Sequence, residues 1–221
     1  MGNAVSILSK EAGWRLKAVW RPKRFFSKHQ LLNLYKCQVL SYIESGVAGY
    51  YHAAPSILDA LDRIQRRLLR ELGVSEEETL ETHKLAPLQT RRDIAMLGLL
   101  QRIAWREAPQ QLLELFPFAP PRAADGMPTR LRVRRHVWQL QEPVFRTDVL
   151  QRSLFGLTVV YNLLPPEVVA QKSVSKFQSS LQMAVRKAAL MNVNGWQVLL
   201  SLRHRPVRAL DFQAFFDVDT H

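Results

Sequence analysis

The sequence has little cysteine and no long apolar run, and both shortages narrow the class of protein. Only Cys37 is a cysteine among 221 residues, which excludes an internal disulfide framework and a cysteine-based zinc site. Cys37 shares a predicted helix with an apolar stripe, so we expect a buried thiol. No apolar run reaches the roughly 18 residues of a membrane-spanning helix, and the first residues do not resemble a secretory signal. We therefore expect an intracellular protein, nuclear or cytoplasmic and not secreted.

The sequence also lacks the motifs that catalysis would require. Polymerases hold two metal ions about 4 Å apart with paired carboxylates, and no Asp-Asp pair occurs here. Asp217 and Asp219 alternate near the end of the chain, which is a weak pattern for a metal site. The histidines are scattered, and neither a Gly-x-Ser-x-Gly sequence nor a Gly-rich phosphate loop is present. We expect no cofactor, no metal site and no catalysis by this chain alone.

Acidic residues are the other scarce group. Lys and Arg number 31 against 19 Asp and Glu, which gives a formal net charge of +12 and a pI near 10.3. A basic surface attracts polyanions, chiefly nucleic acid or an acidic membrane face. The alternative is that the arginines pair with carboxylates of the same chain. The acids Asp59 and Asp62 each precede an arginine by four residues, Arg63 and Arg66, so ion pairs are expected there.

Hydrophobic periodicity predicts a mainly α-helical fold, an irregular helical bundle. Helices are expected at residues 3–20, 28–44, 55–72, 76–83, 90–105, 110–115 and 174–191, with a short one near 196–202. In the 55–72 helix an apolar stripe is formed by Ile57, Leu61, Ile64, Leu68 and Leu72. The 90–105 helix is apolar nearly all round, which indicates a central position.

The residue composition of the chain changes after a proline-rich segment, and this change sets the predicted domain boundaries. Residues 1–116 form a helical domain, residues 117–130 a proline-rich loop, residues 131–191 short strands plus a C-terminal helix, and residues 192–221 a tail. Short segments rich in β-branched and aromatic residues lie at 137–140, 144–146 and 154–160. They predict a small β-hairpin element near 135–160.

Basic side chains gather in clusters that suit phosphate binding. One predicted stripe lies opposite the apolar face of the 55–72 helix and contains Arg63, Arg66, Arg67 and Arg70. The other clusters are Arg21, Lys23, Arg24 and Lys28 around a turn, Arg130, Arg132, Arg134 and Arg135 in a strand-like alternation, and Arg203, Arg205 and Arg208. The alternative for the helix stripe is a solvated face that Asp59, Asp62 and Glu71 partly neutralise.

Several aromatic residues lie beside these charges, where they could stack unpaired bases or belong to the core. We expect core positions for Phe26 and Tyr35. For such residues, which include Phe25 and Trp138, a core position is the more frequent role, and Tyr50 stays open between the two.

A series of phrases in fixed order carries a resemblance to a known family. The phrases are Leu34-Tyr35-Lys36, Ser41-Tyr42-Ile43-Glu44-Ser45-Gly46, Asp62-Arg63-Ile64-Gln65-Arg66-Arg67, Leu85-Ala86-Pro87-Leu88 before Arg91-Arg92-Asp93, Asn162-Leu163-Leu164-Pro165, and Ser173-Val174 with Phe177 and Leu181. Together they resemble the thumb and connection segment that follows the catalytic palm in reverse transcriptases of non-LTR retrotransposons. The similarity covers roughly residues 5–185. Tyr161 stands where the family usually has tryptophan.

The resemblance implies a thumb-like helical bundle that grips template–primer nucleic acid. It implies that Lys36, Arg63, Arg66 and Arg67 face RNA or DNA, and that the missing palm domain of the parent polymerase is a possible partner. The family's Asp-Asp box has no counterpart here. The chain is therefore expected to be a remnant or fragment of an RNA-directed DNA polymerase that binds nucleic acid non-specifically and is not catalytic by itself.

The alternative function is a helical protein-interaction or membrane-surface protein without nucleic-acid binding. Gly2 and Ser6 fit the short pattern for N-myristoylation. One acyl chain with the basic turn at residues 21–28 would hold a membrane surface weakly. The sequence leaves the oligomeric state open.

Overall fold

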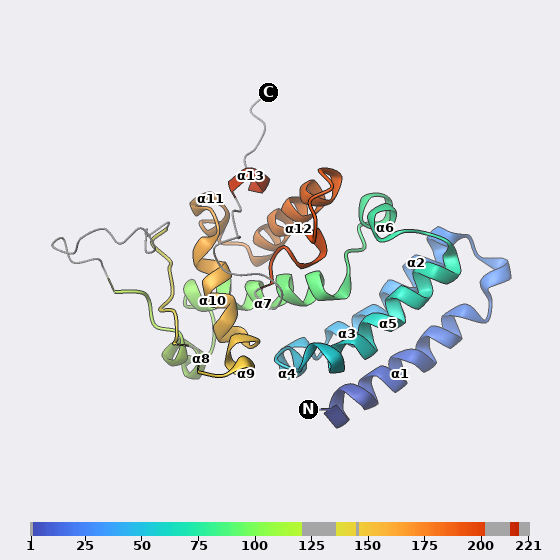
Figure 1. The fold of residues 1–221 in the computed structure, drawn as a ribbon, viewed down its shortest axis with the longest axis horizontal. Coiled ribbons are helices and arrows are strands. Elements are labelled where there is room, and N and C mark those ends of the chain that lie inside the picture. Colours follow the sequence, from blue (N-terminus) through green and yellow to red (C-terminus); the bar gives the residue numbers. More distant parts are fainter. Residues whose placement is uncertain (1, 121–135, 145, 202–212, 217–221) are drawn as a thin grey trace.

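The computed structural model describes residues 2–120, 136–144, 146–201 and 213–216, and the described chain is mainly helical (Figure 1). The predicted mainly α fold class is confirmed. The elements are α1 (Gly2–Trp20), η1 (Lys23–Phe25), α2 (Lys28–Tyr35), η2 (Lys36–Leu40), α3 (Ser41–Glu44), α4 (Val47–Tyr50), α5 (Pro55–Leu72), α6 (Glu76–His83), α7 (Leu88–Ala104), α8 (Gln110–Leu115), α9 (Asp148–Gln151), α10 (Leu154–Leu163), α11 (Pro166–Val169), α12 (Val174–Leu190), η3 (Trp196–Val198) and α13 (Gln213–Phe216). No described helix is both long enough and apolar enough to cross a membrane.

Helices α1 and α5 lie side by side at one end of the molecule (Figure 1). Helix α1 buries Val5, Ala12, Leu16 and Val19, which recur on one helical face. Helix α5 begins at Pro55, which suits a first turn, and ends at Gly73, whose φ of 63° is the left-handed conformation favoured after a helix. Apart from Ile57, which is half-buried, the predicted apolar stripe of α5 is buried.

The α2–η2–α3 segment is one continuous helical run with a π-helical turn, η2, in its middle. Ser27 and Gln30 form a reciprocal capping box at its start. Tyr35 is fully buried, as predicted, and its hydroxyl donates to Gln65 Oε1 at 3.3 Å. Cys37 is exposed, so the prediction of a buried thiol was wrong. Cys37 lies two residues from both Tyr35 and Val39 in the sequence. On a helix this spacing places the Cys37 side chain away from the face on which Tyr35 and Val39 are buried.

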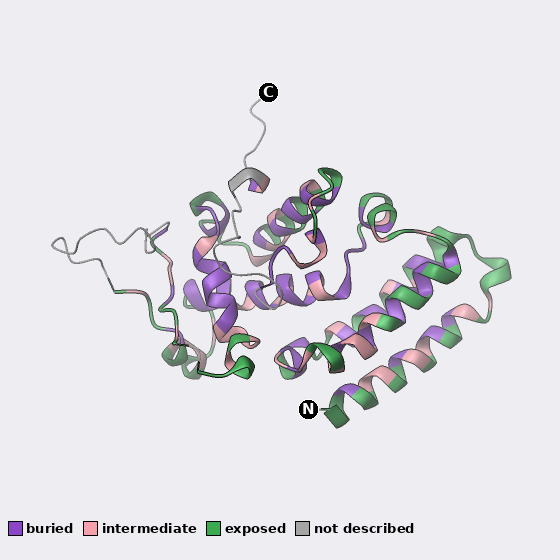
Figure 2. Ribbon diagram, viewed as in Figure 1, coloured by how far each residue is buried: buried purple, intermediate pink, exposed green. Residues whose placement is uncertain are grey.

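Helices α10 and α12 both pack against α7 (Figure 1). These contacts confirm the predicted central position of α7. Figure 2 shows that most of its length is buried. Gly98 permits the close approach of α12, since a Cβ there would lie 2.4 Å from Gln178 Nε2. The absence of a side chain at this position therefore leaves room for the Gln178 side chain of α12.

The predicted β-hairpin element near 135–160 was wrong for most of its length, because residues Leu154–Leu163 form helix α10. Helix α10 is short and buries residues on several faces, so its sequence shows no helical periodicity and resembles a core strand. Among the described residues, the strand-like pairing is one isolated bridge between Phe118 and Leu140. The proline-rich loop at 121–130 and the strand-like residues 131–135 lie outside the described residues.

Candidate nucleic-acid interface

A groove of about 690 Å³ runs between α1 and α5 and is mainly basic at its polar positions. It is lined by Ser9, Lys10, Gly13, Trp14, Leu16, Lys17, Trp20, Arg21, Arg63, Ile64, Arg67, Leu68 and Glu71. Five of these side chains are cationic and one is a carboxylate. Leu16, Ile64 and Leu68 are buried, so they provide an apolar floor between the charged walls. The two helices thus combine positive charge, aromatic rings and an apolar surface in one concave site.

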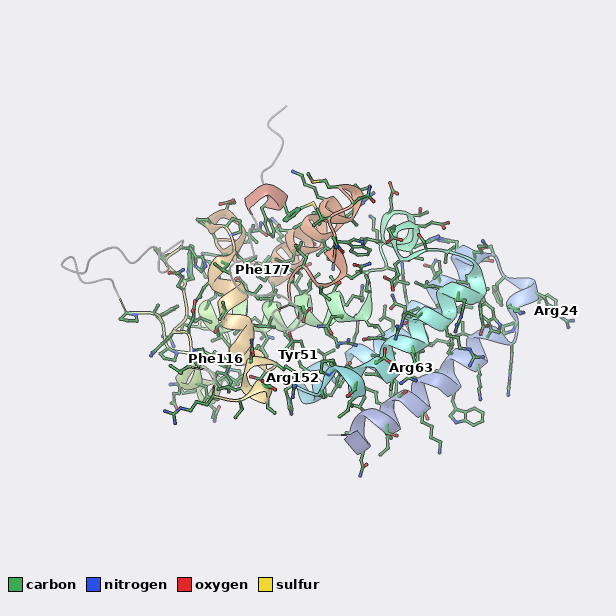
Figure 3. All side chains as sticks on the ribbon, viewed as in Figure 1. Arg24, Tyr51, Arg63, Phe116, Arg152 and Phe177 are labelled. Carbon is green, nitrogen blue, oxygen red and sulfur yellow. The ribbon has the colours of Figure 1, made fainter. Side chains whose placement is uncertain are left out.

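The predicted arginine stripe lies on α5 with all four members exposed as expected, and two of them, Arg63 and Arg67, line the groove. Figure 3 shows Arg63 on this helix. Arg63 Nε lies 3.0 Å from Asp59 Oδ2, Arg66 also pairs with Asp59, and Arg67 Nε lies 2.7 Å from Glu71 Oε1. Exposed pairs of this kind contribute about 0–1 kcal/mol, so a phosphate can replace the carboxylate as partner at little cost.

The pairing of Asp62 differs from the sequence-based expectation. Asp62 was expected to pair with Arg66, four residues on, but it binds Arg92 of α7 instead. Asp62 lies on the inner side of α5, where α7 packs, whereas Arg66 points to solvent with Asp59. Of the three acids expected to neutralise the stripe, only Asp59 and Glu71 do so.

The α1 wall was missed in the sequence apart from Arg21, which directly follows the helix and belongs to the predicted basic turn. Its exposed residues Lys10, Trp14, Lys17 and Arg21 recur every three or four positions and form one helical stripe. The ammonium of Lys17 lies 4.6 Å from the centre of the Trp14 ring. The three- or four-residue spacing of these side chains is a signal in the sequence that could have revealed the stripe.

The basic turn beyond α1 extends the positive surface. Lys23, Arg24 and Lys28 are all exposed, and Figure 3 shows Arg24 at this end of the molecule. Lys23 Nζ lies 5.0 Å from the centre of the Trp20 ring, and the Arg24 guanidinium lies 4.8 Å from that of Phe25.

The aromatic pair in this turn lies at the surface. Phe25 is 72% and Phe26 39% exposed. The prediction of a core position for Phe26 was wrong, because the turn η1 after Pro22 projects away from the helices that form the core. Tyr50, which was left open, is buried, and its hydroxyl donates to Ile43 O at 2.8 Å.

Lys36 does not line the groove. Its ammonium donates to the carbonyl of His83 at the end of α6, and the side chain is half-buried. Burial first, and then the charge of Arg91, lowers the pKa of Lys36. The structure therefore gives Lys36 an internal partner, and the nucleic-acid contact implied by the resemblance is not supported.

Other predicted positions fall outside the described residues. These are Arg130, Arg132, Arg134, Arg135, Arg203, Arg205, Arg208, Asp217 and Asp219. Within the part of the chain that is described, no group of three or more His, Cys, Asp or Glu side chains could hold a metal ion. Gly2 is exposed at the start of α1.

The phrases that carry the family resemblance form a buried polar network. Gln65 accepts from Tyr35 and donates to the carbonyl of Ala86 at 3.1 Å. Arg92, which is 1% exposed, donates to both carboxylate oxygens of Asp62 at 2.7 and 2.9 Å. These residues belong to three different phrases. Their spacing in the sequence is thus explained by contacts that hold α2, α5 and α7 together.

The downstream phrase has a similar internal role. Asn162 Oδ1 accepts from the backbone N–H of Leu140 at 2.9 Å, and its Nδ2 donates to the Leu140 carbonyl at 2.8 Å. The Tyr161 hydroxyl donates to Gln101 Oε1 of α7 at 2.9 Å. Both residues of α10 therefore satisfy buried polar groups of other segments.

Comparison with protein-family models, curated proteins and solved structures finds no match for this chain. The link to reverse transcriptases stays a proposal.

Proposed function

We propose that this chain binds the phosphate backbone of RNA or DNA through the α1–α5 groove, as a non-catalytic remnant or fragment of a retrotransposon reverse transcriptase. The observation that supports the proposal most is the meeting of two basic stripes in one groove. Lys10 and Lys17 come from α1, Arg21 directly follows it, and Arg63 and Arg67 come from α5. The order of the family-like phrases supports the polymerase origin, and the palm domain is the proposed partner in the parent enzyme.

The electrostatics of the groove favour a polyanion over a single small anion. The cations are distributed along two neighbouring helices. The basic turn with Lys23, Arg24 and Lys28 lies at the same end of the molecule and adds further positive charge. Each phosphate that a cation neutralises releases counterions, which makes the affinity fall steeply with salt. The surface pairs with Asp59 and Glu71 reduce the positive charge but do not cancel it.

The test is the salt dependence of binding to a short duplex and to a single strand. The triple variant Lys10→Gln, Arg63→Gln, Arg67→Gln should bind more weakly, and its salt slope should flatten by about one unit per lost contact. A charge-matched control replaces three exposed cations outside the groove, Arg102, Lys176 and Arg186. If both triple variants lose the same affinity and slope, binding depends on net charge and not on the groove.

The alternative function has its own outcome in this assay. Binding to anionic vesicles without binding to either nucleic acid would support a membrane-surface protein. A primer-extension assay with magnesium or manganese should give no product, since the sequence contains no Asp-Asp pair for the two metal ions. Templated extension by the purified chain would overturn the proposed lack of catalysis.

A further inference from the structure

We propose that the α1–α5 groove prefers single-stranded nucleic acid, with an unpaired base stacked on Trp14. This inference rests on the proposed function and adds the substrate class of the same site. It follows from the position of a large aromatic side chain inside the basic groove.

Trp14 is not needed for the packing of α1. The helix already buries Val5, Ala12, Leu16 and Val19 against its neighbours, whereas Trp14 is 55% exposed. A large apolar side chain so exposed at the wall of a concave site is typical of a binding surface. Trp14 is therefore available to a ligand without disturbing the core.

The charges around Trp14 are spaced along the same helical stripe. Lys10 precedes it by one turn and Lys17 follows it by one turn, with the Lys17 ammonium 4.6 Å from the ring centre. Arg63 and Arg67 line the opposite wall of the groove. Phosphates bound by these cations would hold the strand along the groove and place a base beside the indole ring.

The volume and the apolar floor of the groove suit a nucleic-acid base better than an isolated carboxylate ligand. Its volume of about 690 Å³ lies within the range of about 300–1,000 Å³ for ligand pockets. Its floor of Leu16, Ile64 and Leu68 is apolar and suits the flat face of a base more than a solvated acid. In a duplex the bases are paired and stacked on each other, so only their phosphates could bind here.

The experiment compares one oligonucleotide as a single strand and as a duplex, measured by fluorescence anisotropy with three single variants. Trp14→Leu keeps an apolar side chain but removes the ring. It should weaken single-strand binding by between about 5-fold and 150-fold, the range for one stacked base, and leave duplex binding unchanged. Trp14→Phe retains a smaller ring and should recover part of the loss. Trp138→Leu removes an indole outside the groove that stacks on Trp105 at 5.1 Å, and it should change neither affinity.

Intrinsic fluorescence provides a second measurement on the same proteins. A stacked base should quench the Trp14 emission of the wild-type protein, and the quenching should decrease strongly in Trp14→Leu but persist in Trp138→Leu. Circular dichroism would establish that each variant keeps its helices.

The outcomes separate this inference from the proposed function. If Trp14→Leu binds the single strand like the wild type, or loses the same factor on the duplex, stacking on Trp14 is overturned while backbone binding stands. If the wild type binds neither form, or the Lys10, Arg63 and Arg67 triple variant binds as before, the proposed function itself is overturned.

Discussion

The buried ion pair between Arg92 and Asp62 offers the sharpest test of how α5 and α7 are held together. Arg92 is 1% exposed, and its two terminal nitrogens donate to Asp62, with a further hydrogen bond of 3.0 Å to Gln89 Oε1. Burial works to lower the pKa of Arg92, but the hydrogen bonds and charge of Asp62 outweigh it, so the pKa lies above its ordinary value. Asp62→Asn would leave a buried guanidinium without its counter-charge.

Removing one partner of a buried pair costs about 3–5 kcal/mol. The Asp62 side chain is 27% exposed, so water can solvate part of the site, and we expect the lower end, about 3 kcal/mol. Urea denaturation followed by circular dichroism measures this loss. With a slope of about 3 kcal/mol per molar urea, the midpoint should fall by about 1 M.

The matched control is Asp59→Asn, one turn earlier on the same helix. Its partners Arg63 and Arg66 are exposed, and the change should cost less than about 1 kcal/mol. The double variant Asp62→Asn, Arg92→Met should recover part of the lost stability, because the buried guanidinium is then removed together with its partner. Equal, small losses for Asp59→Asn and Asp62→Asn would refute the structural role of the Arg92 pair.

Two further predictions concern other parts of the chain. Burial, and then the neighbouring His29 and Lys36, lowers the pKa of His83 from 6.5. The unfolded chain therefore takes up this proton more readily, so thermal stability should fall as the pH drops through about 6.5, and His83→Asn should flatten that fall. A pH profile of melting that is the same in both proteins would contradict this. Asn162→Ala leaves the N–H and C=O of Leu140 without their side-chain partner and should cost about 2 kcal/mol or more in chemical denaturation. Asn3→Ala, at an exposed position, is its control, and an equal loss in both would argue against the Asn162 bridge.

The helices that could be predicted are those with complete local signals. Helix α5 has a proline in its first turn, an apolar stripe and a glycine at its end, and its bounds agree with the prediction. Ser27 and Ser173 mark the starts of α2 and α12 by capping. Such signals act within a few residues and need no knowledge of the fold.

The predictions that failed depended on neighbours far away in the sequence. Helix α10 was mistaken for a strand because burial on several faces leaves no periodic pattern. Phe26 was assigned to the core from its chemistry alone, although the turn that carries it lies at the surface. In both cases the deciding factor was the environment of the segment in the folded chain.

Some features of the candidate site also follow from the sequence, whereas others depend on the fold. The sequence by itself determined that Arg63, Arg66, Arg67 and Arg70 share an exposed face, because helical periodicity fixes the faces of an amphipathic helix. Only the tertiary structure decided that α1 lies beside α5 and adds its own basic stripe with Trp14 to form a groove. It also decided that Asp62 pairs with Arg92 and leaves Arg66 to Asp59. A local pattern can fix which residues share a face, but the packing of distant helices selects what that face meets.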